Sequence, residues 1–165
     1  MSGPFDDLLD ANRRNQADFA FAGLTGRPRL GLAVVACMDT RIDPLVVLGL
    51  RPGDAKILRN AGARVTDDVV RSLAIVVAAL GVDRVAVIAH TDCAAAKASD
   101  DELRALVAET AGADTSGWEP LAVADQRATL QSDLARLHAD PLLPDDLVVG
   151  GFVYDVTTGA LTPLS

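Results

Sequence analysis

Short apolar stretches, rich in β-branched residues, recur along the chain and predict the strands of a sheet. The stretches "RLGLAVVAC" (29–37) and "DRVAVIAH" (83–90) are apolar without alternation, which is typical of strands buried on both faces of a parallel sheet. Between them, "AKILRNAG" (55–62) predicts a strand that runs into a glycine-containing loop. Near the end of the chain, "LVVGGFVYDVTTGALTPL" (147–164) predicts a fourth strand and a hairpin with "TTG" as its turn.

Helical patterns lie before and between these strands, and capping residues bound several of them. Asp43 is placed as an N-cap, with Pro44 in the first turn of a short helix. Thr66, followed by two acidic residues, opens a longer helix that stops at Gly81. The first helix has an incomplete apolar stripe, which indicates that it lies against something outside its own domain. The predicted helices cover residues 5–22, 43–50, 66–80, 100–111 and 121–138.

The alternation of strands and helices with short loops predicts the fold class. We expect an α/β fold, in which residues 1–165 form a single domain with a mostly parallel central sheet flanked by helices. In such sheets, ligands bind beyond the carboxyl ends of the strands, where the strand order reverses. If the order begins 2-1-3, the strands that end at Cys37 and His90 are neighbours at that point.

Composition and charge exclude several classes of protein. A net charge of −8 and a pI near 4.6 argue against a nucleic-acid partner, which needs a basic face. The longest apolar run falls short of the ~18 residues that a membrane span requires. The first residues have no basic region followed by an apolar core, so we expect a cytoplasmic protein rather than a secreted one. In a reducing compartment, two cysteines are more often metal-binding or catalytic than a disulfide.

Three residues with the chemistry of zinc ligands occur at these strand ends. Adjacent strands lie about 4.8 Å apart, so Cys37 and His90 can reach one metal ion. Cys93, three residues after His90 in "HTDC", can fold back at the strand-to-helix turn and supply a third ligand. A set of two cysteines and one histidine leaves one position of Zn2+ open, which is typical of a catalytic rather than a structural zinc site.

Asp39 and Arg41 follow Cys37 at every second position, so all three side chains would face the same side of an extended segment. The planar guanidinium of Arg41 suits a carboxylate, and it would orient Asp39 and keep it ionised. Because two thiolates cancel the charge of Zn2+, the metal would polarise water less strongly than a zinc held by three neutral histidines. We therefore expect activity to favour alkaline pH.

Other interpretations of these residues stay open. Cys37 and Cys93 could be core residues or could form a redox switch. Thr91 and Asp92 are interpreted as helix caps. Two basic residues flank Gly62, and they could bind an anion such as bicarbonate or could be solvated or at an interface. These residues are Arg59 and Arg64.

The two motifs "CMDTR" and "HTDC", about fifty residues apart, resemble the C-x-D-x-R and H-x-x-C motifs of the β-class carbonic anhydrases. The resemblance covers roughly residues 30–95 and includes the loop "RNAG", and the short chain is similar to the compact bacterial branch. It implies that Cys37, His90 and Cys93 bind zinc. It also implies that a dyad, Asp39 and Arg41, orients the zinc-bound water. The implied reaction is the reversible hydration of CO2 to bicarbonate and a proton by zinc-bound hydroxide.

The resemblance also implies a homodimer or homotetramer in which the N-terminal helix embraces the partner subunit. The same clade includes enzymes that hydrolyse carbonyl sulfide or carbon disulfide on the same zinc site, and a zinc-binding homologue without catalysis is a further alternative. Two positions depart from the family pattern. Ala63 and Ala94 stand where the family commonly has glycine, and alanine at a position with positive φ would cost stability or shift the loop.

Overall fold

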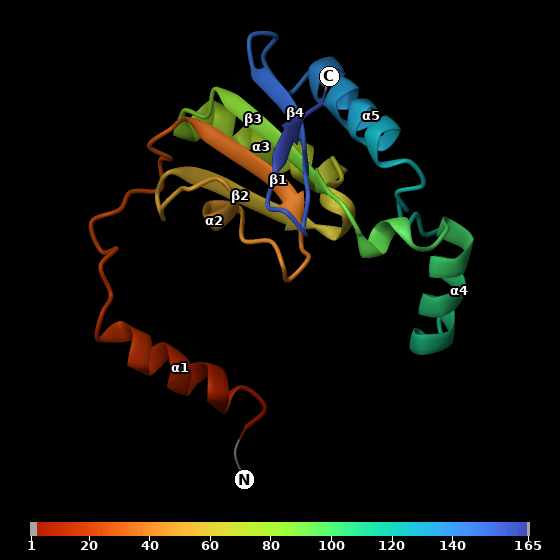
Figure 1. The fold of residues 1–165 in the computed structure, drawn as a ribbon, viewed down its shortest axis with the longest axis horizontal. Coiled ribbons are helices and arrows are strands. Elements are labelled where there is room, and N and C mark those ends of the chain that lie inside the picture. Colours follow the sequence, from red (N-terminus) through yellow and green to blue (C-terminus); the bar gives the residue numbers. More distant parts are fainter. Residues whose placement is uncertain (1–2, 165) are drawn as a thin grey trace.

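Five strands form one sheet in the computed structural model, which describes residues 3–164. The spatial order is β2-β1-β3-β4-β5, so the predicted 2-1-3 beginning is confirmed (Figure 1). The first four strands in this order are parallel, and β5 runs antiparallel to β4. The strands are β1 (Leu32–Cys37), β2 (Ala55–Asn60), β3 (Arg84–His90), β4 (Val148–Tyr154) and β5 (Leu161–Pro163). The α/β class with a mostly parallel sheet is confirmed.

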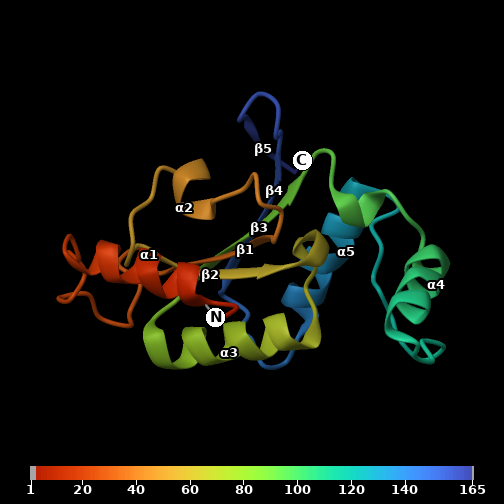
Figure 2. The ribbon, with the colours of Figure 1, turned by 90° about the horizontal axis from the view of Figure 1, so that it is seen from below.

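Helices cover the two faces of this sheet unequally. Within residues 3–164, the long helices α3 and α5 lie on one face, and only the single-turn helix α2 lies on the other (Figure 2). Helices α1 and α4 stand away from the sheet on opposite sides of the molecule (Figure 1). The helices are α1 (Asp6–Gln16), α2 (Pro44–Val47), α3 (Asp67–Leu80), α4 (Asp100–Ala111) and α5 (Gln126–Ala139), with short 3-10 turns η1 (Ala61–Ala63) and η2 (Ala94–Ala96).

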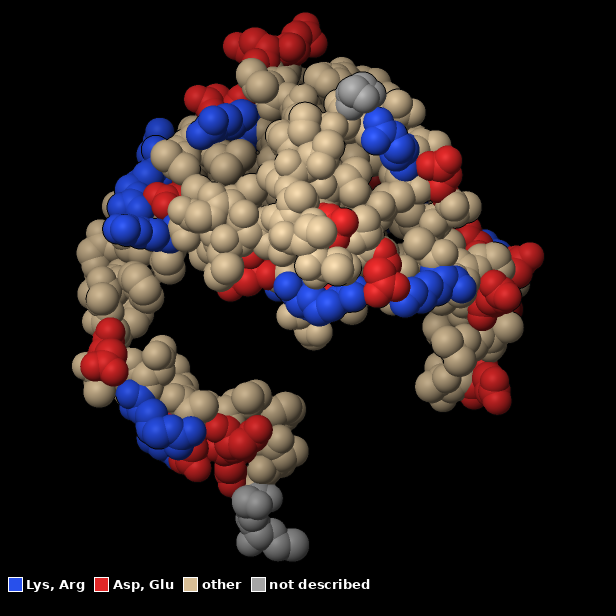
Figure 3. All heavy atoms as spheres, viewed as in Figure 1, with Lys and Arg blue, Asp and Glu red and all other residues tan. Residues whose placement is uncertain are grey.

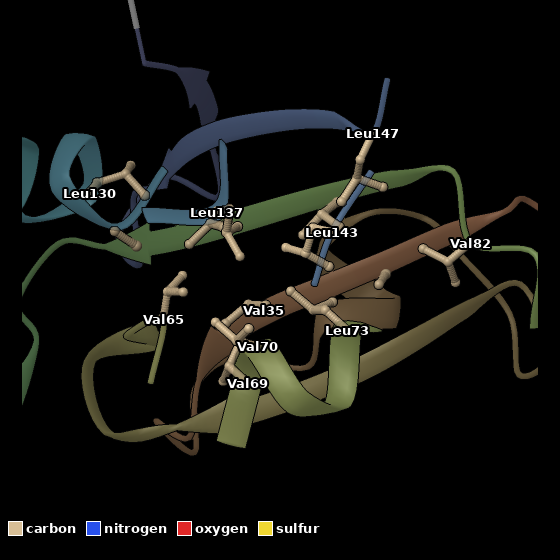
Figure 4. Packing of buried hydrophobic residues seen from close by; sticks show 14 residues of the cluster. Val35, Val65, Val69, Val70, Leu73, Val82, Leu130, Leu137, Leu143 and Leu147 are labelled. Atoms are coloured by element: carbon tan, nitrogen blue, oxygen red, sulfur yellow. The ribbon is translucent and has the colours of Figure 1, made fainter. Parts of the chain in front are cut away.

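The main core lies between the sheet and the helices α3 and α5 (Figure 4). Val35 of β1 and Val87 of β3 point into it, where they meet Leu73 and Leu137 of the two helices. Neighbouring residues such as Val34 point to the opposite face and are equally buried, because successive side chains of a strand alternate. Burial on both faces explains the continuous apolar run of β1.

The predicted caps are present at both ends of α3 and at the start of α2. The Thr66 side chain accepts a hydrogen bond from Val69 N at 3.4 Å, and Gly81 ends the helix with φ of 69°. Asp43 caps α2 by accepting from Leu45 N at 2.9 Å. These caps satisfy backbone groups that the helix itself leaves free, which fixes where each helix begins or ends.

Three predicted helix boundaries were wrong. Helix α2 ends at Val47 rather than at residue 50. Helix α1 ends at Gln16 rather than at residue 22, and the rings of Phe19 and Phe21 instead form an edge-to-face pair with centroids 5.8 Å apart. Residues 121–125 are not helical, because Val123 N donates to the carbonyl of a distant residue, Ala95, at 2.8 Å. This tertiary hydrogen bond holds the segment out of the helix, which begins only after its N-cap, Asp125.

Helix α1 and the segment that joins it to β1 form an arm. No residue of α1 is buried. A hollow separates α1 from the rest of the molecule (Figure 3).

Within residues 3–164, no helix has the length and apolar character needed to cross a bilayer.

Candidate metal centre

Two neighbouring parallel strands, β1 and β3, end at the same edge of the sheet with Cys37 and His90 as their last residues. A turn after β3 then brings Cys93 back to them. The sulfur atoms of the two cysteines and a ring nitrogen of His90 all lie within 4.8 Å of one another, and all three residues are buried. The structure thus brings together the three residues predicted to bind a metal.

The spacing of the two sulfur atoms fits a shared tetrahedral ion. Cys37 Sγ and Cys93 Sγ lie 3.9 Å apart, and both thiols are free. Two sulfur atoms bound at ~2.3 Å to a tetrahedral zinc are separated by about 3.8 Å. A disulfide would need a separation of about 2.05 Å.

His90 offers a nitrogen that has no other function in the protein. Its Nδ1 lies 2.9 Å from the carbonyl oxygen of Thr91, which can only accept, so Nδ1 carries the proton. Among residues 3–164, Nε2 of His90 is the buried side-chain nitrogen or oxygen left without a hydrogen-bond partner. Buried polar atoms are nearly always paired, so this lone pair fits a metal ligand whose other ring nitrogen is oriented by a carbonyl.

The surroundings of the two thiols shift their pKa values in opposite directions. Burial raises the pKa of Cys37, but the neighbouring His90 imidazole and backbone N–H groups outweigh burial and lower it to about 7. Burial and the nearby Cys37 raise the pKa of Cys93. Burial lowers the pKa of His90, whereas the interaction with Cys37 raises it, and the net shift is upward. Cys37 is therefore the thiol that ionises first.

Asp39 and Arg41 form the predicted ion pair, but a turn brings them together rather than an extended strand. Strand β1 ends at Cys37, and the Arg41 N–H folds back to donate to Asp39 Oδ1 at 2.9 Å. The guanidinium then binds both carboxylate oxygens, with Nε to Oδ1 at 3.0 Å and Nη2 to Oδ2 at 2.8 Å. These hydrogen bonds hold the pKa of Asp39 well below its usual range, so the carboxylate stays ionised.

The interpretation of Asp92 as a helix cap was wrong. No side chain caps η2. Asp92 instead binds Arg41, whose Nη1 donates to Asp92 Oδ2 at 2.8 Å, and Lys97, whose Nζ lies 2.7 Å from Oδ1. Thr91 is not a cap either, since its Oγ1 accepts from Val156 N at 3.1 Å. The sequence places Arg41 in one motif and Asp92 in the other, but it does not indicate that their side chains meet.

Arg59 supports the backbone on which the site is built. Its Nε donates to the carbonyl oxygen of Cys37 at 3.0 Å, and its Nη2 donates to that of Asp39 at 2.7 Å. Arg64 binds Asp133 of α5, with Nε to Oδ2 at 2.8 Å. Both guanidinium groups therefore serve structural contacts, which argues against the anion-binding alternative for them.

Only one of the two alanines that replace family glycines has positive φ. Ala63 has φ of 58° and is buried against Cys37 and Cys93, whereas the φ of Ala94 is not positive. The cost expected for alanine thus falls on Ala63, because a left-handed conformation disfavours any residue with a Cβ.

A cavity of about 370 Å3 opens at this centre. Asp39 and Arg41 lie on its wall beside the two cysteines, and most of the remaining wall is apolar. The cavity thus combines two thiols, an ionised carboxylate and apolar walls that suit a small uncharged molecule. The apolar wall residues are Met38, Ala61, Gly62, Ala94 and Ala95.

Comparisons with known proteins found several similar chains. Residues 32–112 match the family model described as carbonic anhydrase. The chain is 36% identical to beta-carbonic anhydrase 1 of Mycobacterium tuberculosis, with 97% of each chain covered. It is 28% identical to the carbon disulfide hydrolase of Saccharolobus solfataricus, over 94% of this chain and 88% of that one.

Among solved structures, the carbonic anhydrase of Streptococcus mutans superimposes with a TM-score of 0.94 at 36% sequence identity. The match covers 100% of this chain and 99% of that one. The similarity therefore includes the arm and α4 as well as the sheet.

Proposed function

The chain belongs to the β-carbonic anhydrase family, and we propose that it is a carbonate dehydratase that reversibly hydrates CO2 to bicarbonate and a proton. The observation that carries this proposal is the convergence of three buried metal donors beside an ionised carboxylate, Asp39. The apolar walls of the cavity suit CO2, which is small and uncharged. We further propose that residues 1–165 act as a single domain in the cytoplasm, where thiols remain reduced.

Zn2+ is the metal that fits the donors best, and Cys37, His90 and Cys93 would hold it. Thiolate and imidazole are donors that zinc prefers, and three of them leave one position for a small ligand. When bound, zinc supplies a Lewis acid that lowers the pKa of water enough to make hydroxide available for attack on CO2.

Asp39 would orient the attacking water. Its Oδ1 accepts from both the backbone N–H and Nε of Arg41, whereas Oδ2 accepts from Nη2 and retains a lone pair that can accept a hydrogen bond from the water. Because its pKa lies well below the usual range, Asp39 remains ionised at working pH. It therefore acts as a hydrogen-bond acceptor that fixes the direction of the water, and the released proton passes on to buffer.

A homodimer or homotetramer is the assembly that the apolar surface favours. Helix α1 exposes two of its apolar side chains, Leu8 at 60% and Leu9 at 54%. An apolar groove of about 400 Å3 lies on the sheet at the opposite end from the metal centre, where only α2 gives cover. We propose that a second copy of the chain covers both surfaces. The groove is lined by residues that include Leu30, Leu32, Leu48, Leu50, Val148 and Phe152.

Hydrolysis of carbon disulfide or carbonyl sulfide is the second candidate function. The relative in Saccharolobus solfataricus is named a carbon disulfide hydrolase, and these linear uncharged molecules suit the same apolar walls. Binding of zinc without turnover is the remaining alternative.

Stopped-flow measurement of CO2 hydration at pH 7 and pH 8.5 tests the proposal, with the zinc content determined on the same sample. We expect one zinc per chain and a turnover that rises with pH, since two thiolates weaken the polarisation of water by the metal. Full zinc occupancy without CO2 turnover at either pH would overturn the proposal, and carbon disulfide hydrolysis by the same sample would then identify the second candidate.

A further inference from the structure

We propose that Asp92, supported by Lys97, is a positioning residue that holds Arg41 in the orientation in which it binds Asp39. This inference rests on the proposed function, because Asp39 is the group whose orientation matters for hydration. His90 and Cys93 of the H-x-x-C motif are the proposed metal donors. Asp92, which lies between them in the sequence, acts instead on Arg41.

The hydrogen bonds of Arg41 are divided between two carboxylates from different loops. One edge of the guanidinium, formed by Nε and Nη2, binds Asp39. The remaining nitrogen, Nη1, donates to Asp92 Oδ2 at 2.8 Å, and Nη2 also donates to the backbone carbonyl oxygen of Asp92 at 3.0 Å. Every nitrogen of the guanidinium is therefore engaged, and the plane of the group is fixed by contacts on both sides.

The backbone of Asp92 adopts a conformation that makes this double contact possible. Its φ is 55°, in the left-handed region that residues other than glycine seldom occupy. In this turn both the carboxylate and the carbonyl oxygen of Asp92 contact Arg41. Asp92 lies between the proposed metal donors His90 and Cys93, in the loop after β3. Its hydrogen bonds with Arg41 therefore connect this loop to the loop after β1.

Lys97 extends these contacts into a row of alternating charges. Its Nζ lies 2.7 Å from Asp92 Oδ1, on the carboxylate oxygen that Arg41 leaves free. Asp92 is thus held between two cations, and Arg41 between two anions.

The exposure of the contact sets the size of the effect. The side chains of Arg41 and Asp92 are 44% and 53% exposed, so Arg41 could swing into solvent if nothing held it. Ion pairs that remain open to water are weak and are screened by salt. We therefore expect Asp92 to tune turnover by a modest factor rather than to be essential.

The first variant is Asp92→Asn, which removes the charge and preserves the shape. Asparagine tolerates the left-handed conformation as well as aspartate does, so the turn and its carbonyl contact should survive. In the zinc-loaded enzyme we expect kcat for CO2 hydration to fall roughly two- to fivefold with KM unchanged. High salt should bring the wild-type enzyme toward the variant. Asp68→Asn, which makes the same charge change at the exposed start of α3, is the matched control and should leave kcat unchanged.

Two further measurements separate positioning from a general loss of structure. In an Arg41→Gln background, Asp92→Asn should have no additional effect on turnover, because a residue that acts through Arg41 has nothing left to hold. In 15N-labelled protein, the Nε–H signal of Arg41 should be sharp in the wild type and should broaden or exchange faster with water in Asp92→Asn. This second readout does not depend on activity.

An unchanged Arg41 signal in Asp92→Asn, or an equal loss of turnover with and without Arg41, would overturn the inference. A wild-type enzyme that binds zinc but fails to hydrate CO2 would instead overturn the proposed function, and the Arg41 signal would still decide whether Asp92 holds the guanidinium. The two failures are therefore distinguishable.

Discussion

Cys37 Sγ and Cys93 Sγ lie 3.9 Å apart in the folded chain, although 56 positions separate the two residues in the sequence. Two features of the fold produce this contact: the adjacent carboxyl ends of β1 and β3, and the tight turn that follows His90. The spacing suits two ligands of one zinc ion, whereas a disulfide would require the sulfur atoms to approach by roughly 1.9 Å. The pair therefore favours a metal site over a redox switch.

Replacing Cys93 by serine should remove the metal. Serine offers a hydroxyl that is a poor ligand for zinc, and we expect zinc to fall from one per chain to well below half after dialysis. Because metal binding stabilises the folded state, the midpoint of thermal unfolding should fall as well, and a strong chelator should lower the wild-type midpoint in the same way. Metal analysis and calorimetry on both proteins check this. A variant that kept its zinc would remove Cys93 from the ligand set.

Zinc affinity should weaken in acid, and the slope should change near pH 7. Each ligand that must lose a proton before binding contributes about tenfold in affinity per pH unit. The pKa of Cys37 is lowered to about 7. Below that pH the thiol carries a proton that it must lose on binding zinc, whereas above it the thiol is already ionised. Because the pKa of His90 is raised, its protonation adds to this effect, so the plot of log affinity against pH should steepen by at least about one unit in acid. Competition with a coloured chelator from pH 6 to pH 8.5 measures it, and a constant slope would contradict the assignment.

Replacing Asp39 by alanine should abolish most turnover and leave the metal in place. A side chain that orients the reacting water contributes roughly a hundredfold or more to the rate. Asp39 lies outside the group of three buried metal donors, so one zinc per chain should remain. Stopped-flow assays at matched zinc content check this. Near-normal turnover would remove Asp39 from the mechanism.

The strands and the residue types gathered at their ends could be predicted because their signals are local. Burial on both faces requires an apolar residue at every position of β1, and the caps of α3 follow from Thr66 and Gly81 alone. The three residues grouped at the proposed metal site are chemically distinctive types at or just after the ends of two predicted strands. Each of these signals can be seen within about fifteen residues of sequence.

The contacts that were missed depend on the tertiary structure. Arg41 and Asp92 are 51 positions apart, and nothing near Asp92 distinguishes a partner of Arg41 from a helix cap. Leu121 is similar, because its left-handed φ of 60° accompanies a hydrogen bond from Arg64 to its carbonyl oxygen, which the helical pattern of 121–138 does not reveal. Such contacts can be predicted only when the three-dimensional positions of the loops are known.

Replacing Asp133 by alanine should destabilise the protein severely. Asp133 is 4% exposed and accepts hydrogen bonds from Arg64 Nε at 2.8 Å and from Val65 N at 3.2 Å. Its removal leaves a largely buried guanidinium without a counter-charge, which should cost about 2 to 4 kcal/mol in the free energy of unfolding. Urea unfolding measures this cost. Asp68→Ala, which breaks an exposed pair with Arg71, is the matched control and should change stability by less than about 0.5 kcal/mol. Equal effects of the two variants would show that burial of Asp133 is not the cause.

Charging the apolar side of the arm should dissociate the proposed assembly. Phe5 and Leu8 are 66% and 60% exposed, and apolar side chains at this density are typical of a surface that a partner covers. In the double variant Phe5→Glu, Leu8→Glu, carboxylates would have to enter an apolar interface, so sedimentation should shift from the oligomer to the monomer. Leu142→Glu, at a position 66% exposed outside the arm and groove, is the control and should sediment as the wild type does. Because α1 buries no residue of its own, thermal unfolding of the dissociated double variant should report only the loss of the partner. A double variant that remains oligomeric would assign the assembly to a surface other than the arm, and a monomeric wild type would contradict the proposed assembly itself.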